Sequence, residues 1–529
     1  MTERLVLIAA TLILAIIGLL PIAAMISQTF FVSGIFSLDA YRALFSADGH
    51  FALLMQHSLQ LSLFTATISM LIGVPLGILL GKTDLPFRGT FALLFTAPLL
   101  IPPYVLAVAW FSVLGRTGYL SSVVSETWLQ QISSAFFGFF GCAFVLTTAF
   151  TPIAMLLTVA FLRTVNTQLE NAGRLVSGWP TILIRISLPL IAPAIGFAAV
   201  LIFLLSLGEI GVPMYLHFPV YPAETLTQFA AFYDFRAATV AAAPLLLVTI
   251  IILGLQIGLQ RRVLELGRRT SAGEVIIIPL GGWRLPLFFI VLAFAIVVVA
   301  MPIGGLIVQS SSLDSYAMAV VRAADSIVRS ISFAATSATF LAVLGLLWGY
   351  LSDRRTLPVW WANELLALFL LALPGSVIGV GLISLWNTKP TSFVYATPAI
   401  LILGYVAQYA ILPMRVISAS LSSVPRSLED ASRLSGAGWL MTMRYIVVPL
   451  ASRGLLAAWL IGYVFSLRDV AISIVVYPPG SDTLPIRILT LMANGAPSLI
   501  AALCVVLIAI TLAPLGLAGL WVKLGTKHL

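Results

Sequence analysis

The sequence predicts an all-α integral membrane protein with twelve transmembrane helices, and three observations support this fold class. Hydrophobic residues make up 60% of the 529-residue chain and charged residues only 9%, whereas about a quarter of a soluble domain is charged. Apolar runs of about 20 residues, the length that a helix needs to cross a bilayer, recur throughout. Lysines and arginines are concentrated in alternate connections between these runs.

Each predicted span is a long apolar run with almost no charge. In the first half they are Leu5–Ser27, Ser58–Leu80, Phe91–Leu114, Gly138–Leu162, Leu190–Val212 and Ala237–Leu259. In the second half they are Leu285–Val308, Ile331–Leu351, Leu365–Leu385, Tyr395–Ile417, Leu455–Val476 and Leu499–Trp521. The first run is too long for the hydrophobic part of a signal peptide and has no clear cleavage site, so we expect it to be retained.

The distribution of positive charge predicts the orientation. Of the 28 lysines and arginines, 20 fall in segments on the side of the N-terminus and seven on the opposite side, while Arg468 lies within a span. Cytoplasmic connections carry the excess of basic residues, so both termini are expected in the cytoplasm. The net charge of +9 is thereby explained without nucleic acid as a partner, and the lipid bilayer is the expected surrounding.

The letters GKT at Gly81–Thr83 resemble part of a phosphate-binding loop but do not make one. Such a loop requires a glycine five residues before Gly81, where this sequence has Leu76. We therefore interpret Lys82 and Arg88 as charges at the membrane edge. Two cysteines in different halves and four scattered histidines predict no metal site, and no nucleophile or base constellation indicates an enzyme. No cofactor is expected in this chain.

Two segments 259 residues apart are alike: LENAGRLVSGWPTILIRISLP at Leu169–Pro189 and LEDASRLSGAGWLMTMRYIVVP at Leu428–Pro449. Each follows the fourth span of its half, so the chain is expected to be a tandem duplication of a six-span unit with a pseudo-two-fold axis along the membrane normal. The expected parts are repeat 1 (1–260), a cytoplasmic linker (261–283) and repeat 2 (284–529). The linker is expected to act as a topology anchor. The matching segments are called loop 1 (about 165–189) and loop 2 (about 424–449).

Each loop begins with a short amphipathic helix. Apolar residues three apart make one face, and charged residues flank it. The apolar residues are Leu169, Ala172 and Leu175 in loop 1 and Leu428, Ala431 and Leu434 in loop 2, and the flanking charges include Glu170, Arg174, Glu429 and Arg433. A helix that merely rests on lipid would have the same pattern. Such a helix does not require the same residues at the same offsets twice.

Loop 2 resembles the EAA loop of ABC-importer permeases, with Asp430, Ala431, Ser432, Gly436, Ile446, Val448 and Pro449 at the family's spacing. Loop 1 departs further: Asn171, Ala172 and Gly173 replace EAA, Ser177 or Gly178 replaces the glycine, and one residue is missing before Ile186, Leu188 and Pro189. The resemblance implies that each loop forms a coupling helix seated on a separate cytoplasmic ABC ATPase, present in two copies. The implied coupling residues are Glu170, Asn171, Ala172, Ser177, Gly178, Pro189, Glu429, Asp430, Ala431, Gly436 and Pro449.

Acidic residues recur at one depth in the fifth span of each half. Glu209 stands 20 residues after Pro189, and Asp469 stands 20 residues after Pro449. Acids within spans are costly and normally find polar partners, and Arg468 is the candidate partner here. One interpretation is an ion-pair or hydrogen-bond cluster that only holds the halves together. The other is that Glu209, Arg468 and Asp469 line the translocation path or its gate.

Three further segments are similar to fused permeases of the ferric-iron group: Thr96–Gly115, Leu371–Gly381 and Ser466–Ile488. The resemblance implies the type I ABC importer permease fold, a bacterial inner membrane, and delivery of cargo by a periplasmic or lipid-anchored solute-binding protein. It favours ferric iron as cargo, with thiamine, 2-aminoethylphosphonate or polyamines as alternatives within the group. The prolines in these segments, Pro98, Pro102, Pro103 and Pro374, are expected to make ordinary helix kinks.

A secondary transporter driven by an ion gradient is the rival from another class, because twelve spans in two halves also describe that group. Such carriers usually need protonatable groups near the midplane of the membrane. Glu209 and Asp469 are instead predicted nearer the outer end of their spans. This position favours the ATP-driven importer.

Overall fold

The computed structural model describes residues 2–32, 35–38, 41–42, 49–115, 118, 125–230, 235–268, 276–310, 312–358 and 360–525. Within these residues, eight helices are long and apolar enough to cross a membrane, and the number rises to twelve if each of four bent helix pairs is one span. The predicted all-helical membrane protein is confirmed at this level. A small antiparallel hairpin of β1 (Phe31–Val32) and β2 (Ile35–Phe36) is the main exception among the described residues.

The first part of the chain, through the end of the sixth predicted span, consists of helices and short π-helical turns. They are α1 (Thr2–Leu14), η1 (Ala15–Leu19), α2 (Leu20–Phe30), α4 (His50–Lys82), α5 (Arg88–Leu100), α6 (Pro103–Leu114), α7 (Glu126–Phe136), α8 (Phe139–Leu162), α9 (Thr167–Arg174), α10 (Trp179–Ile182), η3 (Leu183–Ser187), α11 (Leu188–Leu207), α12 (Gly211–Tyr215), α13 (Tyr221–Ala230) and α14 (Phe235–Arg268).

The remainder of the chain has a similar succession of elements. They are η4 (Gly281–Trp283), α15 (Arg284–Ala295), η5 (Ile296–Ala300), α16 (Met301–Gln309), α17 (Leu313–Arg354), α18 (Trp360–Ala372), α19 (Gly375–Trp386), α20 (Ser392–Tyr395), α21 (Ala399–Tyr409), α22 (Ile411–Leu421), α23 (Arg426–Leu434), α24 (Trp439–Thr442), η6 (Met443–Val447), α25 (Val448–Leu450), α26 (Ser452–Leu467), α27 (Ser473–Val476), α28 (Leu484–Met492) and α29 (Pro497–Gly525).

Three predicted spans are sharply bent: the tenth by 52° between α21 and α22, and the third and ninth so strongly that they are broken, which corrects the interpretation of their prolines as ordinary kinks. The third predicted span is divided into α5 and α6, which meet at 103°, and the ninth into α18 and α19, which meet at 109°. Pro102 and Pro374 have extended backbone angles at these breaks. Pro102 and Pro103 together supply no backbone N–H, and the residue before a proline is disfavoured in the α conformation, so the helix ends there. Pro98 remains in the interior of α5, and Pro103 is the first residue of α6.

The fifth predicted span of each half also ends earlier than expected. Helix α11 ends at Leu207 and α26 at Leu467, and neither reaches the predicted ends at Val212 and Val476. The chain then turns and starts the short helices α12 and α27. Apolar composition continues through the turn, so the sequence pattern did not reveal it.

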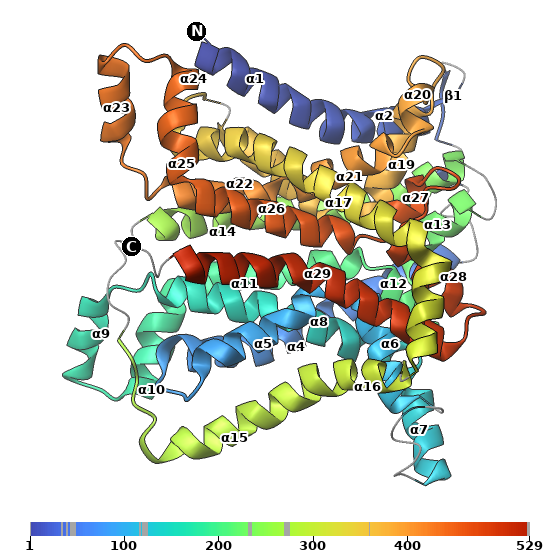
Figure 1. The fold of residues 1–529 in the computed structure, drawn as a ribbon, viewed down its shortest axis with the longest axis horizontal. Helices are drawn as coiled ribbons and strands as arrows, with labels where there is room; N and C mark the ends of the chain where they lie inside the picture. Colours follow the sequence, from blue (N-terminus) through green and yellow to red (C-terminus); the bar gives the residue numbers. More distant parts are fainter. Residues whose placement is uncertain are drawn as a thin grey trace.

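The first helix of each half lies against the other half. Helix α1 packs on α17 and α18, and α15 packs on α5. In Figure 1, α1 runs along the top of the molecule beside the orange and yellow helices, while α15 runs along the bottom beside the blue and teal ones. Val291 and Ala295 of α15 are buried in one cluster with Leu80 and Phe95 of the first half. The two halves are therefore interlocked, although they are consecutive in sequence.

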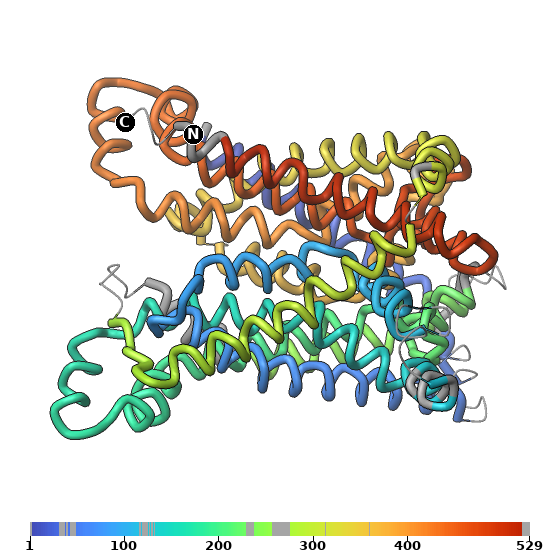
Figure 2. Tube along the Cα trace, turned by 60° about the horizontal axis from the view of Figure 1, so that its bottom comes forward, coloured from blue at the N-terminus to red at the C-terminus, as the bar shows by residue number. Residues whose placement is uncertain are grey.

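Loops 1 and 2 lie at the same end of the molecule. Figures 1 and 2 show α9 and α23 projecting at the left end, which also holds the start of α1. Helix α29 ends on the same side. Helices α7 and α28 lie at the opposite end. The arrangement matches the sidedness predicted from the basic residues, with both loops and both terminal helices directed to one side.

Candidate functional site

The helix of loop 1 is held by a buried ion pair. Glu170 points inward from α9, and its Oε1 atom accepts from Lys82 Nζ at the C-terminal end of α4. Ser187 Oγ donates to the same oxygen over 2.7 Å. The Lys82 and Glu170 side chains are 1% and 0% exposed. The helix of loop 1 therefore covers Lys82 at the end of α4 and supplies its counter-ion, and the placement of this charge at the membrane edge stays a prediction.

The helix of loop 2 is held in the same manner from α17. Arg354 Nη2 lies 2.6 Å from Glu429 Oε1, and Arg354 Nε donates to the same oxygen over 2.8 Å. The Tyr350 hydroxyl donates to Glu429 Oε2 over 2.8 Å. Arg354 Nη2 also donates to the Val424 carbonyl, which lies just before α23. The second pair is better satisfied than the first, where Glu170 Oε2 has no partner.

These contacts set the orientation of both amphipathic helices. Glu170 and Glu429 face the protein interior, whereas the apolar residues face outward. Leu175 is 88% exposed and Leu434 is 90% exposed. Isolated exposed leucines are common, but here the same exposure recurs at matching positions of two projecting helices.

The other predicted coupling residues lie mostly on the outer surface of the loops. Asn171, Ala172, Gly178, Pro189, Asp430, Ala431, Gly436 and Pro449 are exposed, and Ser177 is half-buried. Of the predicted coupling residues, the structure thus buries Glu170 and Glu429 and leaves the others exposed or half-buried.

The helices of the two loops end differently. In loop 2, Gly436 has a φ of +83°, Ala437 N donates to Ser432 O and Gly436 N donates to Arg433 O, each over 3.1 Å. This is the Schellman pattern, in which a left-handed residue, usually glycine, closes the helix. In loop 1, Gly178 has a φ of −77° and an extended conformation. The residue missing from loop 1 is thus accompanied by loss of the left-handed glycine.

A cavity of about 90 Å³ lies where the two halves meet. Its lining includes both helix breaks and both turns that follow α11 and α26. The polar lining residues are Tyr104, Glu209, Gln408, Tyr409, Arg468 and Asp469. At its edge Gly208 approaches Pro374 so closely that a Cβ atom would lie 3.0 Å from Pro374 Cα. We call this space the central cavity.

Glu209 and Asp469 cap the short helices that follow the two turns. Glu209 Oε1 accepts from Gly211 N over 3.0 Å and from Val212 N over 3.4 Å. Asp469 Oδ1 accepts from Ile472 N and Ser473 N over 3.1 and 3.0 Å, while the Tyr409 hydroxyl donates to Oδ2 over 2.8 Å. Side-chain oxygens at such positions satisfy the first N–H groups of a helix.

Arg468 has a different partner from the one expected. Its Nη1 atom donates to the Leu99 carbonyl, near the end of α5 in the other half. Among the described residues it forms no ion pair with Glu209 or Asp469. The break after α5 leaves carbonyls without helical partners, and a cation beside a helix C-terminus is favourable. The guanidinium therefore joins the halves through backbone, and the acids are satisfied by N–H groups.

Sequence reasoning missed Tyr104 and Gln408 in the central cavity and Lys82, Tyr350 and Arg354 behind the loops. The Tyr104 hydroxyl and Gln408 Oε1 are buried without a partner. In the sequence, Tyr104 follows the double proline and Lys82 and Arg354 end long apolar runs. Those positions were visible, but only the tertiary structure shows what the side chains contact.

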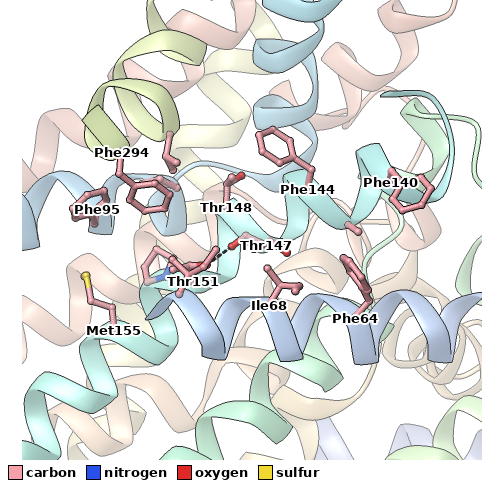
Figure 3. A pocket seen from close by; sticks show the side chains of 15 residues that line it. Phe64, Ile68, Phe95, Phe140, Phe144, Thr147, Thr148, Thr151, Met155 and Phe294 are labelled. Carbon is pink, nitrogen blue, oxygen red and sulfur yellow. Dashed lines mark hydrogen bonds between the residues drawn. The ribbon is translucent and has the colours of Figure 1, made fainter. Parts of the chain in front are cut away.

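A second cavity, of about 230 Å³, lies away from all the predicted site residues. Figure 3 shows it lined by aromatic side chains such as Phe64, Phe95, Phe144 and Phe294, with Thr147 and Thr151 on one wall. It lies between α4, α5, α8 and the helix that starts the second half. Its apolar walls do not suit a hydrophilic solute. Among the described residues no cluster of three or more His, Cys, Asp or Glu could hold a metal ion.

Comparison with known proteins confirms the predicted resemblance to transport-system permeases. The chain is 26% identical over 460 residues to the ferric transport system permease protein of Actinobacillus pleuropneumoniae, a match that covers 82% of this chain and 66% of the relative. The Fe(3+)-transport system permease protein of Haemophilus influenzae is 23% identical over 409 residues, or 76% of each chain. The spermidine/putrescine transport system permease protein of the same organism matches 29% of this chain at 26% identity. No protein-family model matches.

Proposed function

We propose that this relative of ferric transport permeases is the membrane permease subunit of an ABC importer, built from two six-helix repeats with their cytoplasmic ends at loops 1 and 2. It is a transport subunit, and a separate pair of cytoplasmic ATPases supplies the energy. An extracytoplasmic binding protein delivers the cargo to the opposite end. Both termini then lie in the cytoplasm of a bacterium, at its inner membrane.

The observation that carries this proposal is the pair of projecting loops. Helices α9 and α23 stand at one end of the molecule, each with an inward glutamate and an outward leucine that is almost fully exposed. A helix resting on lipid needs no buried counter-ion. Two equivalent projecting loops instead suit two copies of one partner, arranged about a pseudo-two-fold axis.

The central cavity is the proposed translocation path or gate. It lies between the halves and is bounded by broken helices, which membrane proteins tolerate where they line a cavity. Glu209, Asp469 and Arg468 fix the turns and join the halves, while Tyr104 and Gln408 leave polar atoms without a partner. A relative movement of the halves would change this space, which is the geometry that alternating access requires.

Ferric iron is the proposed cargo, because the matches that span most of the chain are to ferric permeases. The hydroxyl, amide and carboxyl oxygens around the central cavity are ligand types that hard cations prefer. Thiamine, 2-aminoethylphosphonate and polyamines remain alternatives, and partial matches to 2-aminoethylphosphonate and spermidine/putrescine permeases, over 27% and 29% of the chain, support the last two equally.

Reconstitution in liposomes tests the function. The permease is combined with its ATPase and binding protein, and uptake of radioactive ferric iron is measured with ATP inside the vesicles. We expect uptake only when ATP, the ATPase, the binding protein and the permease are all present. Spermidine is the competing cargo in the same assay. Uptake driven by an imposed ion gradient in vesicles that lack the ATPase would instead identify a secondary transporter.

A further inference from the structure

Two buried ion pairs join the helices of the loops to long helices of the two halves. Anchor 1 is Lys82–Glu170, between α4 and α9, and anchor 2 is Arg354–Glu429, between α17 and α23. Helix α4 has 33 residues and α17 has 42. In both anchors the cation ends the long helix and the glutamate lies in the first turn or two of the short one, so the geometry is repeated.

Such pairs are poorly suited to a purely stabilising role. The cost of removing two charges from water commonly offsets their attraction, and an apolar pair of similar volume would hold the helices as well. A charge-assisted contact with several hydrogen bonds instead fixes distance and direction. Glu429 accepts from both Arg354 and Tyr350, which leaves it little freedom.

Beside each anchor, further contacts connect it to the first helix of the other half. Beside anchor 1, the Lys82 carbonyl accepts from Ile278 N over 2.8 Å, and Asp84 Oδ1 accepts from Leu280 N over 2.9 Å, just before α15. Beside anchor 2, Glu3 of α1 lies 3.4 Å from Arg433 of α23. Displacement of either loop is thus transmitted to a long helix of its own half and to the first helix of the opposite half.

We infer that Lys82, Glu170, Arg354 and Glu429 are positioning residues that make each coupling helix move as one body with α4 or α17. This inference rests on the proposed coupling to an ATPase. The anchors remain closed through the transport cycle, so that movement at the loops reaches the central cavity without being absorbed by local bending. Anchor 1, with Glu170 Oε2 unpartnered, is the looser of the two.

Amide hydrogen exchange in the permease alone measures how firmly each anchor holds the helix of its loop. Glu170→Gln is expected to raise exchange in residues 167–174 by about tenfold or more and to leave 426–434 unchanged, and Glu429→Gln to do the reverse. Glu364→Gln is the control, because Glu364 is also buried and pairs with Arg415 over 2.7 Å, outside residues 167–174 and 426–434. Equal exchange in all variants, or the same increase in the control, would overturn the inference.

The complete transporter gives the second measurement, cargo moved per ATP hydrolysed. Glu170→Gln and Glu429→Gln are expected to lower this ratio by about tenfold while the ATPases still co-purify, because local opening competes with transmission. Two further variants keep opposite charges paired and are expected to retain coupling. One is Arg354→Lys, which gives anchor 2 the cation of anchor 1, and the other is the double exchange Lys82→Glu with Glu170→Lys. If variants that lack an anchor fold and still move as much cargo per ATP as the wild type, the inference is rejected. If the wild-type complex shows no ATP-driven uptake, the proposed function fails, whereas the exchange measurement still decides the anchors.

Discussion

At the residue scale, Gly436 ends the helix of loop 2 in a backbone conformation that side chains disfavour. A Cβ atom at this position would meet no neighbour within 4 Å, so space is not the constraint. The constraint is the φ of +83°, which costs a residue with a Cβ about 1–2 kcal/mol. Gly178 of loop 1 has no such requirement, since its φ is −77°.

Gly436→Ala is therefore expected to impair coupling, and Gly178→Ala is expected to be tolerated. The first change strains the turn that sets the direction of loop 2, and the second fits an extended backbone that any residue adopts. The check is binding-protein-stimulated ATP hydrolysis by the complete transporter, with membrane insertion as the control. Equal loss in the two variants would show that the backbone angle is irrelevant.

The helix caps at the central cavity predict different losses of stability when Asp469 and Glu209 are replaced. Asp469→Ala removes hydrogen bonds to two backbone N–H groups and leaves the Tyr409 and Ser473 hydroxyls without this acceptor. Glu209→Ala removes only backbone contacts. Loss of a cap costs about 0.5–2 kcal/mol, and an orphaned buried hydroxyl adds about 1–3 kcal/mol. Thermal unfolding in detergent is expected to show the larger decrease for Asp469→Ala; the reverse order would contradict the cap assignment.

At the element scale, the helices of the two loops have opposite faces with opposite roles. The inner face is fixed by one glutamate, and the outer face presents Leu175 or Leu434. Because these leucines are already exposed in the permease alone, replacing them removes little packing from it. They can instead contribute to an interface, where burying one leucine provides about 1.5–3 kcal/mol.

Leu434→Ser and Leu175→Ser are expected to weaken association with the ATPase by roughly tenfold or more, because each removes apolar area from the interface. Co-purification over a range of ATPase concentrations measures this effect. Leu285→Ser is the control, since Leu285 is 63% exposed at the start of α15, outside both loops. Full retention of the ATPase by both loop variants would place the partner elsewhere.

At the scale of the whole molecule, the loops and the helix ends at the two termini share one side. The proposed orientation places that side in the cytoplasm. Ser435→Cys in loop 2 is therefore expected to escape a membrane-impermeant maleimide in intact cells and to react after permeabilisation. Lys389→Cys, at an exposed position between α19 and α20, is expected to react from outside. The native Cys142 and Cys504 are buried and provide a low background. Labelling of Ser435→Cys in intact cells would refute the orientation.

The sequence predicted where many residues of the candidate site lie, but it did not predict which residues they contact. Repetition located Glu170 and Glu429 in equivalent loops and Glu209 and Asp469 at equivalent depth. Helical periodicity alone could not decide which face of α9 or α23 turns inward, because a buried glutamate requires a cation that lies about 80 residues away in the sequence. For the same reason Arg468 was assigned to the nearby acids, whereas it bonds to the Leu99 carbonyl of the other half.

The sequence by itself determined the membrane environment, the helical class and the matching loops, because hydropathy, charge placement and repetition are carried by short segments of chain. Only the tertiary structure decided that the third and ninth spans are broken, that the first helices of the halves are exchanged, and that Lys82 is buried. Those features depend on which distant surfaces satisfy freed backbone groups and buried charges. Such pairing is a property of packed helices and cannot be read from any one of them.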